Sequence, residues 1–151
     1  MSPTAGSTDR ELALKLWIVL ARAGRALERH ARRDIERYGL SLTEFAVLEA
    51  LYHKGDLPIG EVGDRVLLKS GSMTYVIDKL EERGLLERRA CPTDQRVTFV
   101  RITADGRRQI REIFPAHADA IRVATSGLPA DEKRQTIALL KKLGLHAQES
   151  F

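Results

Sequence analysis

The sequence predicts a mainly α-helical protein of the α+β class, in which one β-hairpin follows three short helices. Apolar residues recur at spacings of three and four along most of the 151 residues, as in helices with one buried face. Alternation with a period of two occurs in two short stretches, 85–90 and 97–102, and turn residues (Cys-Pro-Thr-Asp-Gln-Arg, 91–96) lie between them. The predicted order is one long helix, three short helices, a hairpin and two further helices.

The first helix is expected over residues 9–38, after a small, polar stretch at 1–8 that we expect to be disordered. Its apolar residues form a wide band, because Leu14, Trp17 and Ala21 add a second face to the main stripe. One small domain offers too little surface to bury such a band. The pattern therefore predicts a dimerisation helix that packs against another subunit.

Three short helices are expected next, each with its own boundary signal. Ser41 and Glu44 match a capping box, in which each side chain bonds the backbone N–H of the other residue. Pro58 suits the first turn of the second short helix, and Ser70 is a good N-cap for the third. Gly84 stands where the third helix needs a left-handed residue to end it.

The remainder of the chain, residues 104–151, predicts two helices that join the first helix in dimerisation. Thr103 can cap the first of them. Pro115 lies inside it and is expected to kink the helix or to end a turn. Gly127 and Pro129 mark the break before the last helix.

Charge and composition limit which partners the protein can bind and in which cellular compartment it is expected. The net charge is +4, and residues 65–101 hold eight Lys or Arg against five Asp or Glu, which permits a polyanionic partner. A single cysteine, Cys91, excludes an intramolecular disulfide. No secretory leader opens the chain, and the apolar runs are too short to cross a bilayer. We expect a cytoplasmic protein that binds no membrane.

Three short helices followed by a hairpin make a winged helix-turn-helix, so residues 39–103 predict a DNA-binding lobe. The major groove of B-DNA admits one helix, whose N-terminal residues must be short and polar to approach the bases. The hairpin tip would then place Arg96 at the adjacent minor groove, where negative potential is concentrated. Lys79 could instead pair with Glu81 or Glu82. The residues expected to contact DNA from the helix are Ser70, Ser72, Thr74, Tyr75 and Lys79.

Four segments resemble the MarR (multiple antibiotic resistance regulator) family of winged helix-turn-helix transcriptional regulators. They are LSLTEFAVL (40–48), DKLEERGLLER (78–88), DQR (94–96) and ITADG (102–106). The resemblance implies a homodimer built from the N- and C-terminal helices, which binds a pseudopalindromic double-stranded operator and represses transcription. In this resemblance Arg96 is similar to the minor-groove arginine and Asp94 to the acid that orients it.

The resemblance also implies a ligand pocket where the dimerisation helices meet the DNA-binding lobe. Trp17, Phe45 and Tyr52 could line it and bind a small aromatic or phenolic molecule that releases the protein from DNA. The same three aromatic residues could equally be part of the hydrophobic core. A winged-helix nucleic-acid binder that responds to no ligand is the corresponding alternative.

Cys91 provides a different alternative, a thiol sensor of oxidants or electrophiles. It begins the hairpin turn, and Arg88, Arg89 and Arg96 lie close in sequence, where their charges would favour the reactive thiolate. It could also be a small residue tolerated in a turn. We expect no enzyme, because the sequence has no phosphate-binding loop, dinucleotide fingerprint or zinc-protease motif. The four histidines are scattered, so we expect no metal and no cofactor.

Overall fold

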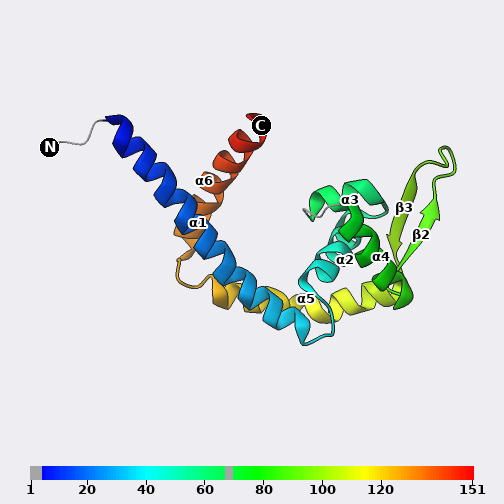
Figure 1. The fold of residues 1–151 in the computed structure, drawn as a ribbon. Coiled ribbons are helices and arrows are strands. Elements are labelled where there is room, and N and C mark those ends of the chain that lie inside the picture. The colour runs from blue at the N-terminus through cyan, green and yellow to red at the C-terminus, as the bar shows by residue number, and fades with distance from the viewer. Residues whose placement is uncertain (1–4, 67–69) are drawn as a thin grey trace.

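The computed structural model describes residues 5–66 and 70–151, with side chains from residue 8 to 66 and from residue 72 onward. It has the shape of a U (Figure 1). One arm is a winged lobe, and the other arm pairs the first half of the N-terminal helix with the C-terminal helix. The elements in order are α1 (Ala5–Glu36), α2 (Leu42–Lys54), β1 (Leu57–Pro58), α3 (Ile59–Arg65), α4 (Ser70–Glu82), β2 (Leu86–Ala90), β3 (Thr98–Ile102), α5 (Ala104–Ala124) and α6 (Ala130–Glu149).

The predicted fold class is confirmed, and three details differ from the expectation. Helix α1 begins at Ala5, so residues 5–8 are helical although they were expected to be disordered. A helix that is already formed extends at low cost into such small residues. Helix α5 continues through Pro115, so the helix does not end there as one of the two expectations had it, and α5 packs against α1 and α2. The two-residue strand β1 was not predicted, because it is too short to show a period.

The core lies in the lobe, where the capping box of α2 is formed as predicted. The Ser41 hydroxyl accepts the N–H of Glu44 at 3.0 Å, and the Glu44 carboxylate accepts the N–H of Ser41 at 3.0 Å. Leu40 and Phe45 flank this cap and are both buried, as in a hydrophobic staple. The other fully buried side chains come from α1, α2, α3, α4, β2, β3 and α5, and the largest are Ile35, Leu48, Leu51, Met73, Ile77, Leu80, Leu86, Ile110 and Ile113.

One polar contact joins the lobe to α1 and α5. Asp34 of α1 is the one charged side chain buried among the described residues, at 7% exposure. Its Oδ2 lies 3.5 Å from Nδ1 of His117 in α5, and Arg37 Nη1 lies 3.7 Å from its Oδ1. The His117 ring in turn packs on Phe45 of α2, with centroids 4.8 Å apart. Three elements therefore meet at this imidazole.

The three strands form one antiparallel sheet in the order β1-β3-β2. Leu86 pairs with Ile102 and Ala90 with Thr98, which sets the register of the hairpin. At the base of the hairpin, the Thr103 hydroxyl donates to the Gly84 carbonyl at 2.6 Å and accepts the N–H of Gly106 at 3.1 Å. The hairpin is therefore fixed to the end of α4 and to the start of α5.

The two helices of the other arm leave their apolar faces uncovered. Helix α6 has no buried residue, and Trp17 of α1 is 70% exposed. Between the two helices lies an apolar cleft of about 390 Å³, lined by Leu16, Leu20, Leu140 and their neighbours. Exposed apolar area of this extent is typical of a surface that another molecule covers.

The close approach of α5 to β2 yields a test of the fold. A Cβ at Gly106 would lie 2.1 Å from the Leu85 carbonyl oxygen and 2.7 Å from Cγ1 of Ile102, so the backbone would have to move. We expect Gly106→Ala to lower the free energy of unfolding by about 1–3 kcal/mol in urea denaturation at fixed protein concentration. The control is Gly60→Ala in α3, whose Cβ would meet no atom within 4 Å. Equal stability of the two variants would contradict this packing.

Candidate nucleic-acid interface

Helix α4 has one buried face and one exposed polar face, as the sequence predicts. Met73, Val76, Ile77 and Leu80 point into the core of the lobe. Ser72, Thr74, Tyr75 and Lys79 are exposed on the other side. Ser70 begins the helix, but its side chain lies outside the described side chains. The exposed residues are mostly short near the N-terminus of the helix, the end that must approach base edges closely.

The exposed face of α4 contains one preformed interaction between Tyr75 and Lys79. The Lys79 ammonium lies 5.3 Å from the centroid of the Tyr75 ring, and the Tyr75 ring is 62% exposed. The pKa of Lys79 is raised above the ordinary value of a lysine. The largest cause is the hydrogen bond with Tyr75, and the next is the charge of Tyr75. Glu44 and Glu82 raise it further, through their charges alone. Lys79 is therefore a cation held beside an aromatic ring on the exposed polar face of α4, the candidate DNA-contacting surface.

The hairpin tip presents Arg96 to solvent in a fixed orientation. Its side chain is 91% exposed, yet Nε lies 3.1 Å from Oδ1 of Asp94 and Nη2 lies 3.4 Å from Oδ2. Asp94 also accepts the backbone N–H of Arg96 at 3.0 Å. These bonds from Arg96 lower the pKa of the Asp94 carboxyl, which stays ionised. Two of the predicted residues are thus brought together as one unit.

A salt-bridge network fixes the hairpin to α4, and the sequence analysis gave it no role. Arg88 of β2 bonds Asp78 of α4 at 2.6 Å through Nη2 and Glu81 at 2.6 Å through Nη1. Glu81 also accepts the backbone N–H of Arg88 at 3.0 Å. Arg88 is 29% exposed, while Asp78 and Glu81 are 54% and 40% exposed, so the strength of the network rests on its several short bonds rather than on burial. Helix α4 and the hairpin therefore hold a defined relative orientation.

The C-terminal end of α4 is attached to the turn that follows α1. Arg83 donates to the Gly39 carbonyl at 2.8 Å, and its Nη1 lies 3.7 Å from a Glu44 carboxylate oxygen. The left-handed backbone of Gly39 (φ 75°) lets the chain turn there. This contact joins the end of α4 to the turn between α1 and α2.

Cys91 lies at the start of the hairpin tip and is partly exposed. Its sulfur lies 3.4 Å from the Thr93 hydroxyl. The Thr93 side chain and then the Thr93 backbone lower the pKa of the thiol. The cause is thus hydrogen bonding within the turn, and not the guanidinium charges that the sequence analysis invoked.

The three aromatic residues proposed for a ligand pocket lie in different places. Trp17 lines the cleft between α1 and α6. Phe45 is buried against His117, and Tyr52 is partly buried at the core, with the Arg107 guanidinium 6.0 Å from its ring centroid. A single chain therefore brings Phe45 and Tyr52 into one lobe and leaves Trp17 on the other arm.

The described part of the chain contains no group of three or more His, Cys, Asp or Glu placed to hold a metal ion. None of its helices combines the length and the apolar character needed to cross a membrane.

Comparison with known proteins identifies the family. The model of the MarR family matches residues 40–98. The HTH-type transcriptional regulator MhqR of Bacillus subtilis (strain 168) is 50% identical over 139 residues, which cover 92% of this chain and 96% of that protein.

Solved structures share the fold along most of the chain. A MarR family transcriptional regulator from Streptomyces coelicolor, in complex with DNA, has a TM-score of 0.80 at 22% identity and covers 97% of this chain and 90% of its own. Bordetella bronchiseptica BpsR, solved to explain how 6-hydroxynicotinic acid regulates its DNA binding, has a TM-score of 0.79 at 26% identity, over 86% of this chain and 98% of its own. The chain belongs to the MarR family of winged helix-turn-helix transcriptional regulators.

Proposed function

We propose that the protein is a homodimeric repressor that binds a specific double-stranded operator and leaves it when a small aromatic ligand binds. The observation that carries the DNA-binding part is the pairing of Arg96 with Asp94 at an exposed hairpin tip, in a lobe that also exposes the polar face of α4. An arginine already oriented by a carboxylate loses little rotamer freedom when it enters a minor groove. The Streptomyces coelicolor neighbour solved with DNA supports this use of the fold.

The two parts of the lobe have separate roles in recognition. Helix α4 enters the major groove, where Ser72, Thr74 and Tyr75 meet base edges and Ser70 lies at the N-terminus. Lys79 contacts a phosphate farther along the helix. Arg96 reads the width and negative potential of the neighbouring minor groove. The Arg88 network keeps the distance between helix and hairpin matched to the two grooves.

The dimer is formed by the arm of the U, with residues 9–38 and 104–151 as dimerisation segments and 39–103 as the DNA-binding lobe. The uncovered faces of α1 and α6 support this assignment. A two-fold dimer places its two recognition helices in successive major grooves, about 10 base pairs apart, so the operator is a pseudopalindrome.

Substitution of the hairpin arginine tests the DNA-binding proposal. With an operator selected from a random DNA pool, we expect Arg96→Ala to weaken binding by about 1–3 kcal/mol per site in fluorescence anisotropy. The control is Arg122→Ala, which removes the same charge from α5, where Arg122 pairs with Asp119 at 2.9 Å. An Arg96→Ala variant that binds the operator as tightly as the parent would refute the role of the hairpin tip. Equal losses of affinity in Arg96→Ala and Arg122→Ala would show that Arg96 contributes only its net charge.

Release by a ligand requires a molecule that prefers the DNA-incompetent arrangement of the lobes, since equal affinity for both states shifts nothing. We propose a small aromatic acid or phenol, bound in the lobe near Phe45 and Tyr52; Trp17, on the other arm, does not line this site within one chain. The regulation of BpsR by 6-hydroxynicotinic acid supports this chemical class.

A thiol switch is the second candidate, because Thr93 lowers the pKa of Cys91 at the hairpin tip. The thiolate would react with an oxidant or a quinone-type electrophile, and the adduct would lie beside the Arg96 turn and displace it from the groove.

One experiment separates the two modes of release. Operator binding is measured for the parent and for Cys91→Ser, with a panel of aromatic acids and phenols and, separately, with benzoquinone or peroxide. We expect a panel member to raise the melting temperature and to release both proteins from DNA alike. The thiol switch would be established if benzoquinone or peroxide released the parent but not Cys91→Ser, and no member of the aromatic panel released either protein. A panel without effect in either protein would refute the ligand.

A further inference from the structure

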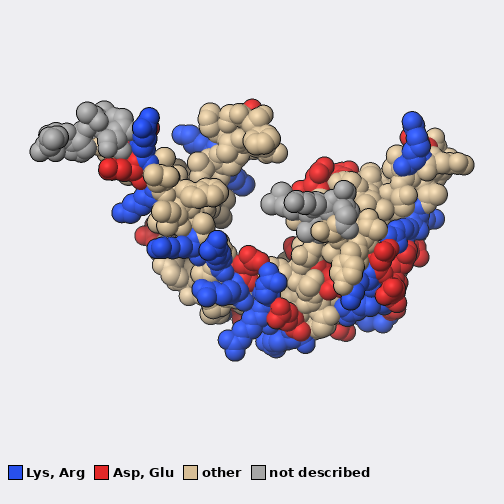
Figure 2. Space-filling view, viewed as in Figure 1, with Lys and Arg blue, Asp and Glu red and all other residues tan. Residues whose placement is uncertain are grey.

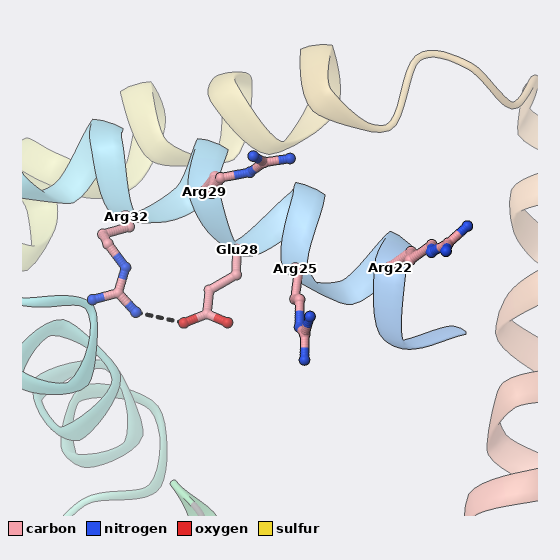
Figure 3. Close-up of a pocket in the computed structure, with 5 residues that line it drawn as sticks. All are labelled: Arg22, Arg25, Glu28, Arg29 and Arg32. Carbon is pink, nitrogen blue, oxygen red and sulfur yellow. Dashed lines mark hydrogen bonds and ion pairs between the residues drawn. The ribbon is translucent and has the colours of Figure 1, made fainter. Parts of the chain in front are cut away.

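Four arginines form a stripe along the second half of α1, which we call the arginine stripe (Arg22, Arg25, Arg29 and Arg32). Their spacings of three, four and three place them on one face of the helix. Together with Glu28 they line a hollow of about 550 Å³ (Figure 3). Figure 2 shows the basic side chains gathered over this half of α1.

The charge of the arginine stripe is largely uncompensated. Arg32 bonds the Glu28 carboxylate at 2.5 Å. Arg22, Arg25 and Arg29 have no carboxylate within salt-bridge distance among the residues that the structure describes. Like charges three and four residues apart destabilise a helix, so the stripe gains nothing from internal contacts. An external anion would turn this repulsion into binding energy.

The position of the stripe separates it from the candidate DNA surface. It follows the exposed apolar residues Leu14 and Ile18 along the same helix face, so it lies next to the part of α1 that a second copy of the chain covers. The winged lobe with its hairpin forms one arm of the U, whereas the second half of α1 lies at the base of the U, beside α5 (Figure 1). Operator contacts and the arginine stripe therefore belong to different surfaces.

We propose that the arginine stripe binds a small molecule that carries two or more phosphate groups. A guanidinium group presents parallel N–H donors that match the oxygens of a phosphate. Three guanidinium groups without an acid partner need a polyanion, since one negative charge neutralises only one of them. Neighbouring arginines on the stripe are about 5–6 Å apart, so two can hold successive phosphates of one ligand. The hollow is open and is lined by α1 alone, so it suits a ligand that is held by charge rather than by burial.

The test uses inorganic tripolyphosphate as the probe and isothermal titration calorimetry of the full chain. We expect one saturable site per chain, with orthophosphate at least tenfold weaker. The double variant Arg25→Gln/Arg29→Gln should bind tripolyphosphate at least tenfold more weakly than the parent. The double variant Arg111→Gln/Arg122→Gln removes the same charge from α5 and should bind within twofold of the parent. The double variant Arg25→Gln/Arg29→Gln, which we call the stripe variant, removes repulsion between like charges. Its melting temperature should therefore equal or exceed that of the parent. If it does not fold, the single variant Arg29→Gln replaces it in the titration.

Every other outcome overturns the proposal. Absence of saturable binding by the parent would mean that a partner subunit or bulk solvent neutralises the stripe. Equal losses in the two double variants would show attraction by net charge alone. Operator affinity is measured in parallel and should be unchanged in the stripe variant. If the stripe variant loses operator affinity and the parent fails to bind tripolyphosphate, the stripe serves the DNA backbone.

Discussion

The feature on which the rest of this structure depends is that α1 and α6 cannot cover their own apolar faces. The lobe has a closed core around Phe45, Ile77 and Leu86, whereas α6 has no buried residue and α1 exposes a series of leucines. Their apolar surface can leave water only against another molecule. In a protein of this family, a second copy of the chain satisfies that requirement. The second copy also sets the distance between the two lobes. The packing of the arms therefore determines the spacing of the two half-sites in the operator.

Within each lobe, polar contacts determine how the surface is presented. Arg88 fixes the hairpin to α4, and Arg83 fixes the end of α4 to the turn after α1. Asp34 and His117 meet where α1, α5 and α2 come together. Arg83 thus joins α1 to α4, and the buried pair joins α1 to α5 and α2. Ligand control of DNA binding needs such a connection between two lobe arrangements.

Local patterns in the sequence predicted the elements, and the family resemblance implied the pairing at the hairpin tip. The capping box joins Ser41 to Glu44, three positions apart, so the sequence displays it directly. The pairing of Asp94 with Arg96 is as local, but its role came from the resemblance. Contacts between distant residues could not be found in this way. Arg88 meets Asp78 ten residues away, and α5 approaches β2 at Gly106. The strand β1 is too short for a periodic signal, and α5 continues through Pro115 because neighbouring helices support it.

The most direct test of the central claim is the stoichiometry of the complex with operator DNA. Native mass spectrometry of the full chain with a duplex of the selected operator would count the chains on each duplex across a protein titration. The account predicts two chains per duplex at every stage, without a complex of one chain, since the dimer forms before it binds. A stable complex of one chain and one duplex, with the affinity of the full operator complex, would contradict it.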